Sequence, residues 1–279
     1  SCNYAPIINF YNSCKMDNNK ERPIFLFAPC QRCGSTMIQR FLNSSSEIFI
    51  WGEHDGYLNL LYTGFNKFSN WNITFRDQRQ MYFEMGFNTW TACLAPDNPA
   101  LHNATINYII ELFRRSPEGK CISRWGFKEV RYNSSVAKWL LTMFPQAKIL
   151  FINRHIASCL TSLLRWEIAR DNNWSRTNTL ESLESWIRIN NSFLSVVDTY
   201  GSICTFKYED IISDKKKFVS EVSSFLEVSE TIINTDVLDD IIYEPNSDSR
   251  NRSNIYISEN EMNLIQNKEV DAILEAYGY

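Results

Sequence analysis

The sequence has no apolar run that approaches the roughly 20 residues needed to cross a bilayer, so we expect no membrane span in this chain. It also lacks internal repeats, low-complexity blocks and linkers rich in Gly, Ser or Pro. Nothing in the composition therefore divides the chain. With 279 residues, 44% of them hydrophobic, it can bury one substantial core, and a single domain of this size is ordinary.

The chain also has no excess of positive charge. It contains 28 Lys and Arg and 32 Asp and Glu, which give a formal net charge of −4. General nucleic-acid binders are usually basic, so we expect no nucleic-acid partner. Any anion site in this protein must instead be a local concentration of arginines and backbone N–H groups.

The chain opens on Ser1-Cys2-Asn3-Tyr4, with neither an initiator methionine nor a signal-peptide pattern, which predicts a chain shortened at its start. We expect residues 1–21 to be a polar lead-in and residues 22–279 to form the domain. Seven Asn-x-Ser/Thr sequons would suit a secretory protein, but asparagine is so frequent here that several arise by chance. The cytoplasm is the favoured location, with the Golgi lumen or the secretory pathway as the alternative.

Eight cysteines are present, and Cys30 and Cys33 form a C-x-x-C pair. No second pair stands at the spacing typical of a zinc site, so we expect no metal. Cys121, Cys159 and Cys204 lie in or beside apolar segments, where a free thiol behaves as a small buried hydrophobe. We favour buried thiols, and disulfides are the alternative.

Residues 22–54 predict a strand, a tight loop, a helix and a second strand. Residues 23–28 are almost entirely apolar, which is typical of a strand buried on both faces of a parallel sheet. Apolar side chains recur at helical spacing over residues 35–42, and residues 48–51 form another short apolar run. We organise the rest of the chain around this unit.

The loop between the first strand and its helix suits a phosphate or a sulfate. Gly34 can take the backbone angles that close the loop, and Ser35 and Thr36 favour a helix start. Several free N–H groups and the positive end of the helix dipole then point at one spot. The lysine of a nucleotide-triphosphate loop is missing before Ser35, and the cation is Arg32 instead. A cysteine phosphatase would need an arginine at a spacing that neither loop cysteine offers.

The remaining chain alternates between strands and helices. Further strands are expected near 121–127, 147–152 and 202–207, and helices near 103–115, 134–144, 156–170, 215–226 and 231–240, with a last helix at the end. This alternation predicts a single α/β domain whose central, mainly parallel sheet has helices on both faces and ligands at the carboxyl ends of its strands. The region 55–120 is expected to be helical and to face the acceptor. Its aromatic-rich part, residues 55–100, would pack on the sheet as a layer or line an acceptor pocket.

Arg154 and Ser162 supply an argument that is independent of the loop. Arg154 stands at the carboxyl end of a central strand, and Ser162 lies about two turns into the following helix. An arginine fork and a hydroxyl held in this way can grip one dianionic phosphate from two sides.

Several segments resemble, in order and spacing, the sulfotransferases that use 3′-phosphoadenosine 5′-phosphosulfate (PAPS). Residues 32–36, Arg-Cys-Gly-Ser-Thr, followed by Trp51-Gly52-Glu53, resemble the family's P-loop-like 5′-phosphosulfate loop. Residues 151–165 resemble its 3′-phosphate motif, although histidine follows the arginine where aspartate is usual. Segments similar to its lysine-bearing, Tyr-Glu-Asp and C-terminal stretches stand at 125–129, 206–210 and 276–279. The resemblance spans residues 23–279.

The resemblance implies which side chains bind the nucleotide. The 5′-phosphosulfate would be held by Arg32, Cys33, Gly34, Ser35, Thr36 and Met37, and the 3′-phosphate by Arg154 and Ser162, with Tyr208 near the nucleotide. A late loop in the family closes over the nucleotide, so Arg250 and Arg252 are expected to contribute there.

The resemblance also implies catalytic roles. Lys128 would neutralise the oxygen that bridges sulfonate and phosphate, and Glu53 would take the acceptor proton. His54 is the rival base, because the unperturbed pKa of histidine is closer to the working pH. A glutamate base places the chain nearer the glycan and tyrosyl types of sulfotransferase than the cytosolic phenol and steroid type.

The family therefore implies an enzyme that moves the sulfuryl group of PAPS to a hydroxyl or amine of a small-molecule, glycan or peptide acceptor, with PAP as product and no metal. Two alternatives stay open. One is a P-loop nucleotide kinase, and the other is a non-catalytic module that binds PAP or a glycan.

Overall fold

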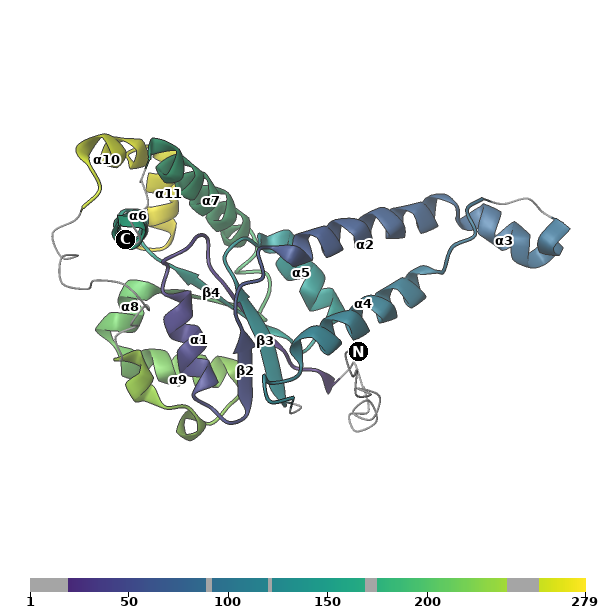
Figure 1. The fold of residues 1–279 in the computed structure, drawn as a ribbon, viewed down its shortest axis with the longest axis horizontal. Helices are drawn as coiled ribbons and strands as arrows, with labels where there is room; N and C mark the ends of the chain where they lie inside the picture. Colours follow the sequence, from purple (N-terminus) through teal and green to yellow (C-terminus); the bar gives the residue numbers. More distant parts are fainter. Residues whose placement is uncertain (1–19, 89–91, 120–121, 169–174, 240–255) are drawn as a thin grey trace, which may run out of the picture.

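Five parallel strands form one sheet in the order β2-β3-β1-β4-β5 (Figure 1). The computed structural model describes residues 20–88, 92–119, 122–168, 175–239 and 256–279. The strands are β1 (Ile24–Phe27), β2 (Ile48–Trp51), β3 (Arg124–Glu129), β4 (Lys148–Asn153) and β5 (Ile203–Lys207). The predicted single α/β domain with a parallel sheet is confirmed.

Both faces of the sheet are covered by helices, and one strand can contribute to both cores because its successive side chains point to opposite sides. In β1, Phe25 and Phe27 join one core cluster, whereas Ile24 and Leu26 join another. The first cluster is covered by α4 (Asn98–Phe113), α5 (Ser134–Met143) and α7 (Arg176–Leu194), and the second by α1 (Ser35–Asn43), α8 (Tyr208–Ser213) and α9 (Lys215–Leu226). Helices on both faces explain why the strands read as nearly continuous apolar runs.

A third cluster of buried side chains packs at the carboxyl ends of the strands, where ligands bind in open α/β sheets. It joins the loop after β1 to α6 (Ile156–Ile168), α7, α10 (Glu259–Ile265) and α11 (Lys268–Ala276). The chain end is fixed here as well, since the hydroxyl of Tyr279 donates to Glu209 at 2.8 Å. The predicted C-terminal segment thus lies beside the Tyr-Glu-Asp segment.

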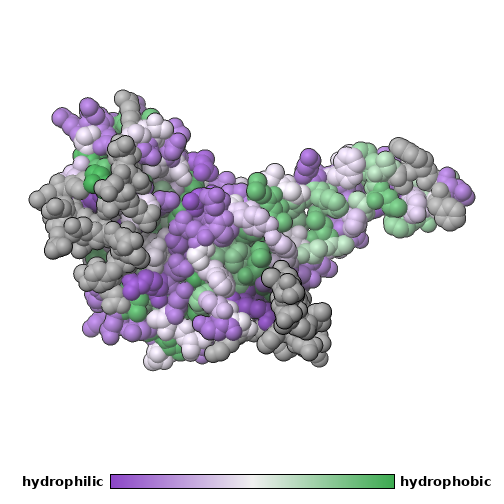
Figure 2. Space-filling model, in the orientation of Figure 1, coloured by the Kyte–Doolittle hydropathy of each residue, from purple (hydrophilic) through white to green (hydrophobic). Residues whose placement is uncertain are grey.

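The helices of residues 55–113 do not form the layer on the sheet that the sequence predicted. The helices α2 (Tyr57–Thr74) and α4 run side by side away from the sheet and carry α3 (Arg76–Met85) and a short 3₁₀ turn (Gly86–Asn88) at their far end (Figure 1). Only the first turns of α2 pack on the core, where Tyr62 and Phe65 contact Trp139 of α5. Further out, apolar and polar residues mix on the surface of the arm (Figure 2). The layer prediction is therefore wrong beyond the base of this arm.

Two other expectations need correction. Residues 231–240 contain no α-helix among their described residues, because two 3₁₀ turns, Glu230–Ile232 and Thr235–Leu238, stand there. The side chain of Asn234 accepts the N–H of Asp236, which favours a turn over a continuous helix. Conversely, the sequence pattern left α7 unpredicted, although Ser175 and Asn178 form a capping box at its start. The polar lead-in at 1–21 lies almost entirely outside the described residues.

Among the described residues, no helix combines the length and apolar character that a membrane span requires.

Candidate active site

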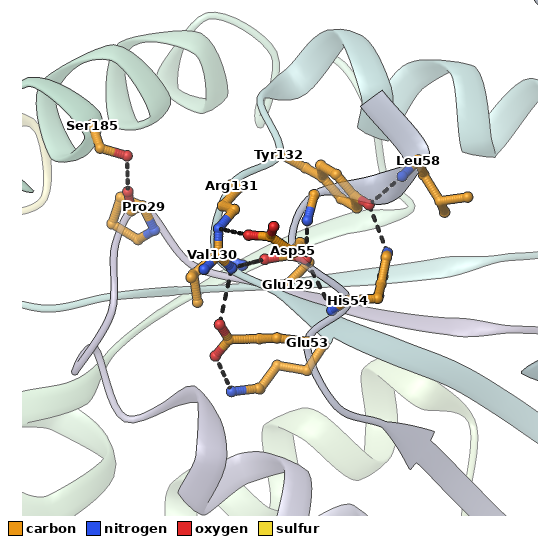
Figure 3. Close-up of polar contacts among 12 residues, drawn as sticks. Pro29, Glu53, His54, Asp55, Leu58, Glu129, Val130, Arg131, Tyr132 and Ser185 are labelled. Carbon is orange, nitrogen blue, oxygen red and sulfur yellow. Dashed lines mark hydrogen bonds and ion pairs between the residues drawn. The ribbon is translucent and has the colours of Figure 1, made fainter. Parts of the chain in front are cut away.

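The loop after β1 presents the start of α1 to the carboxyl edge of the sheet. Gly34 is the N-cap of α1 with a φ of 89°, and it has no side chain to satisfy the N–H groups of the first turn. Arg32, also at positive φ (66°), turns the chain just before it. The hydroxyl of Ser185 on α7 donates to the carbonyl of Pro29 at 3.2 Å and holds the loop from behind (Figure 3). The N–H groups and the positive end of the helix dipole are available to an anion.

Gly34→Ala is expected to destabilise the protein more than Gly56→Ala. Both glycines are in the left-handed helical region, but a Cβ on Gly34 would come within 2.3 Å of the Tyr208 ring, whereas a Cβ on Gly56 would come no closer than 3.3 Å to the flexible side chains of Arg131 and Asn59. The backbone cost is about 1–2 kcal/mol in both variants, and the clash adds about 1–3 kcal/mol at Gly34 alone. Denaturant unfolding measures the difference, and equal losses would contradict the packing of Tyr208 on the loop.

Lys128 links the loop to Glu53. It lies in β3, is 5% exposed, and pairs in register with Leu26 of β1. Its Nζ donates to Oε1 of Glu53 at 2.6 Å and to Oγ1 of Thr36 at 3.2 Å. One ammonium group is therefore within hydrogen-bond reach of both a carboxylate and the first turn of α1.

Arg131 and Glu129 support this group and were not predicted as site residues. Nη1 of Arg131 donates to the second oxygen of Glu53 at 3.0 Å and to Glu129 at 2.7 Å (Figure 3). Glu129 is fully buried and also accepts the N–H groups of His54 and Gly56, at 3.2 and 2.8 Å. Burial raises the pKa of Glu129, but the N–H groups of Gly56 and Val130, together with Arg131, hold the pKa below its usual value. Their place at the carboxyl end of a strand was the signal that could have found them.

The ring of His54 lies in an aromatic cluster. Its ring packs on Phe113 and Phe127, and Nε2 is hydrogen-bonded to the hydroxyl of Tyr132 at 2.6 Å (Figure 3). Burial lowers the pKa of His54, despite the nearby charge of Glu129. The geometry thus brings Glu53, and not the imidazole of His54, to the predicted phosphosulfate loop.

Arg154 and Ser162 meet the same loop from the other side. Nη1 of Arg154 donates to the carbonyl of Arg32 at 2.9 Å, and Nε of Arg32 donates to the hydroxyl of Ser162 at 3.2 Å. The guanidinium of Arg154 lies 4.2 Å from the centre of the Tyr208 ring. Nε of Arg154 is buried and has no hydrogen-bond partner among the described residues. The two predicted anion-binding sets therefore share one edge of the sheet.

His155 stands where the family usually has aspartate. Its side chain caps the start of α6. Its Nδ1 accepts the N–H of Ala157 at 3.2 Å, as an aspartate oxygen can. The N–H of His155 is in turn held by Glu209 at 3.3 Å. The substitution therefore keeps the start of α6, and with it Arg154, in place.

The other predicted nucleotide-binding residues divide into three groups. Ser35 and Thr36 begin α1 at the loop. The side chains of Cys33 and Met37 are buried in core clusters, so these two residues can offer only backbone N–H groups to an anion. Arg250 and Arg252 lie outside the described residues.

A pocket of about 370 Å³ adjoins Arg131. Its lining is mainly polar and comes from the loop, the end of β3, α6 and α7, and it includes Gln31, Glu167 and Glu181. None of the described aromatic residues of 55–100 lines this pocket.

The fold and site define an α/β protein with a glycine-closed loop after β1, a buried lysine paired with a partly exposed glutamate, and an arginine at the next strand end. The chain belongs to the sulfotransferase family, whose sequence profile matches residues 23–231. Among curated protein sequences, none matches the chain.

Solved structures agree on the fold. The sulfotransferase domain from the Synechococcus PCC 7002 olefin synthase has a TM-score of 0.51 at 15% identity, covering 95% of this chain and 98% of that chain. The sulfotransferase domain from the curacin biosynthetic pathway has a TM-score of 0.51 at 14% identity, covering 93% and 98%. Mouse sulfotransferase SULT7A1, solved with PAP, matches at a TM-score of 0.46 and 13% identity, covering 93% and 86%, and carries no argument at that level. Identities this low bear on the fold alone.

Proposed function

We propose that this sulfotransferase transfers the sulfuryl group of PAPS to a hydroxyl or amine of an acceptor, with Glu53 as base and Lys128 as the cation at the reacting group. The observation that carries the proposal is the position of Lys128 Nζ, which bonds both Glu53 and Thr36. Membership of the family supports the reaction class.

The side chains suit a nucleotide with two anionic ends. The uncapped first turn of α1, together with Ser35 and Thr36, can hold the 5′ end. Arg154 can hold the 3′ end, since its buried Nε has no partner among the described residues and a guanidinium prefers paired oxygens. Bound PAPS supplies an activated sulfonate whose leaving group is a phosphate. No metal is part of the proposal, because Arg32, Lys128 and Arg154 supply the positive charge.

Lys128 has two tasks in this scheme. While it bonds Glu53, it occupies Oε1, the oxygen that would otherwise meet the acceptor hydroxyl. An anion at Thr36 attracts the same ammonium, since Thr36 Oγ1 is already 3.2 Å from Nζ. Donor binding would thus draw Lys128 towards the loop and free Oε1 of Glu53 for the acceptor proton. The lysine then stabilises the charge that develops on the leaving phosphate.

Arg131 keeps Glu53 aimed at the acceptor. It bonds Oε2 of Glu53, so Oε1 can change partner without loss of the side chain's position. The polar pocket beside Arg131 is where we expect the acceptor to enter. Its glutamates and amides favour a sugar or a peptide over a steroid.

A radiolabelled-sulfate transfer screen tests the proposal, with sugars and tyrosine peptides first and phenols and steroids after them. Label on any acceptor, lost in Glu53→Gln, is the expected result. The non-catalytic alternative predicts PAP binding without transfer to any acceptor in the screen.

Arg154→Ala is expected to weaken PAP binding by about 10- to 100-fold, because hydrogen bonds to a charged partner are worth about 1.5–3 kcal/mol. Calorimetry on the folded variant measures the effect. Arg188→Ala, which removes an exposed arginine from α7, is the matched control and should bind PAP normally. If both variants bind PAP equally well, Arg154 does not hold the 3′-phosphate.

A further inference from the structure

Three buried cysteines from distant parts of the chain meet behind the loop. Cys30 and Cys33 come from the loop itself, and Cys159 comes from α6. The Sγ atoms of Cys30 and Cys33 are 3.6 Å apart, and those of Cys33 and Cys159 are 3.5 Å apart. All three sulfur atoms lie within 4.8 Å of one another, and their residues are 7%, 0% and 2% exposed. We call this set the three-cysteine cluster.

The spacing of the sulfur atoms suits a metal ion. With metal–sulfur bonds of about 2.3 Å and tetrahedral angles, two thiolates bound to one ion are about 3.8 Å apart. A disulfide would require about 2.05 Å, a much larger movement inside a packed core. The observed separations of 3.5 and 3.6 Å are close to the metal-bound value. Side chains already in place need only small shifts to bind an ion.

The charges around the cluster also suit a cation. Burial raises the pKa of Cys33, but hydrogen bonds with Cys159 and Cys30 and the charge of Arg154 hold the pKa well below its usual value. Hydrogen bonds within the cluster and burial raise the pKa of Cys30, and burial raises the pKa of Cys159, so an ion that binds all three sulfur atoms must displace the protons of these two. Three thiolates with a divalent ion carry one net negative charge, and Arg154 can offset it. No Asp, Glu or His from the described residues completes the cluster, so hard oxygen-seeking ions such as magnesium have no ligands there.

We propose that Cys30, Cys33 and Cys159 form a three-thiolate site for a soft d¹⁰ cation, zinc(II) or copper(I). Thiolate ligands select these ions, and copper(I) accepts three of them while zinc(II) takes a fourth ligand. Cys30 lines the 370 Å³ pocket beside Arg131, which provides both an entry path and room for a water as that fourth ligand. The bound ion fastens the loop to α6. This inference concerns the cysteines alone and stands or falls independently of the proposed sulfuryl transfer.

Cobalt(II) is the probe, because it takes the place of zinc(II) and gives a thiolate charge-transfer band. The full chain, freshly reduced and metal-free, is titrated with cobalt(II) and then with zinc(II). We expect the band to saturate at one equivalent, zinc(II) to abolish it, and zinc(II) to raise the melting temperature by mass action. The site would be overturned if cobalt(II) gave no band saturating near one equivalent and copper(I), added under reducing conditions, also failed to bind at one equivalent. Copper(I) in competition with zinc(II) distinguishes the two ions, and magnesium should have no effect.

Cysteine variants locate the site. Cys33→Ser should lose the band, whereas Cys204→Ser, which changes a half-buried cysteine outside the cluster, should keep it. Cys30→Ser changes the most exposed member and is the second variant in case Cys33→Ser does not fold. A band that persists in both Cys30→Ser and Cys33→Ser would place the metal elsewhere. PAP binding, measured separately, reports on the proposed function and not on this site.

Discussion

Replacing Lys128 with methionine is expected to lower the rate of sulfate transfer by about 100-fold or more, while PAP affinity changes severalfold at most. Methionine keeps much of the apolar length of the lysine but removes the ammonium that bonds Glu53 and Thr36. Transition-state charge on the leaving phosphate then lacks its cation. Single-turnover transfer measures the rate, and calorimetry measures the affinity.

Lys148→Met is the matched control for this variant. Lys148 also belongs to a strand and forms an ion pair, with Glu227. It is the first residue of β4, however, and so lies at the amino ends of the strands, opposite the candidate site. It should leave transfer unchanged. If Lys128→Met loses PAP binding and turnover to the same extent while still folded, the lysine holds the donor in the ground state and has no special role in the transition state.

Glu53→Gln is expected to lower turnover by about 100-fold or more, because an amide of the same shape cannot take the acceptor proton. PAP affinity should stay within severalfold. The measurement is transfer rate against acceptor concentration, since loss of a base lowers kcat more than it raises KM.

Two further variants sharpen this test. Asp55→Asn makes the same carboxylate-to-amide change on an exposed partner of Arg131, and it should be nearly silent. His54→Gln tests the rival base, and our account expects transfer within severalfold of the wild type once stability is matched. A His54→Gln variant that loses turnover as completely as Glu53→Gln would contradict the assignment of Glu53.

The sheet was predictable because its strands are buried on both faces, so that β1, β2 and β4 in particular appear in the sequence as nearly continuous apolar runs. The loop was predictable from Gly34, whose φ of 89° leaves little choice of residue. The arm of α2 and α4 was not, because a helix that packs on one partner helix and a helix that packs on a sheet have the same periodicity. The helix α7 was also missed, although its capping box is visible in the sequence.

Contacts between distant residues were the least predictable part of the site. The bond between Arg131 and Glu53 joins residues 78 positions apart, and the contact between Cys33 and Cys159 joins residues 126 apart. Spacing in the sequence identified the C-x-x-C pair but did not indicate that Cys159 joins it in the three-cysteine cluster. The orientation of His54 likewise depends on Tyr132, which only the folded chain brings to it.

The most direct test of the account is a calorimetric comparison of PAP, adenosine 5′-monophosphate and ATP with magnesium. We predict that PAP binds at one site and at least about 10-fold more tightly than either, because only PAP offers a 3′-phosphate to Arg154 and Ser162. Equal affinity for PAP and adenosine 5′-monophosphate, or tighter binding of ATP with magnesium, would contradict a donor site spanning the loop and the end of β4.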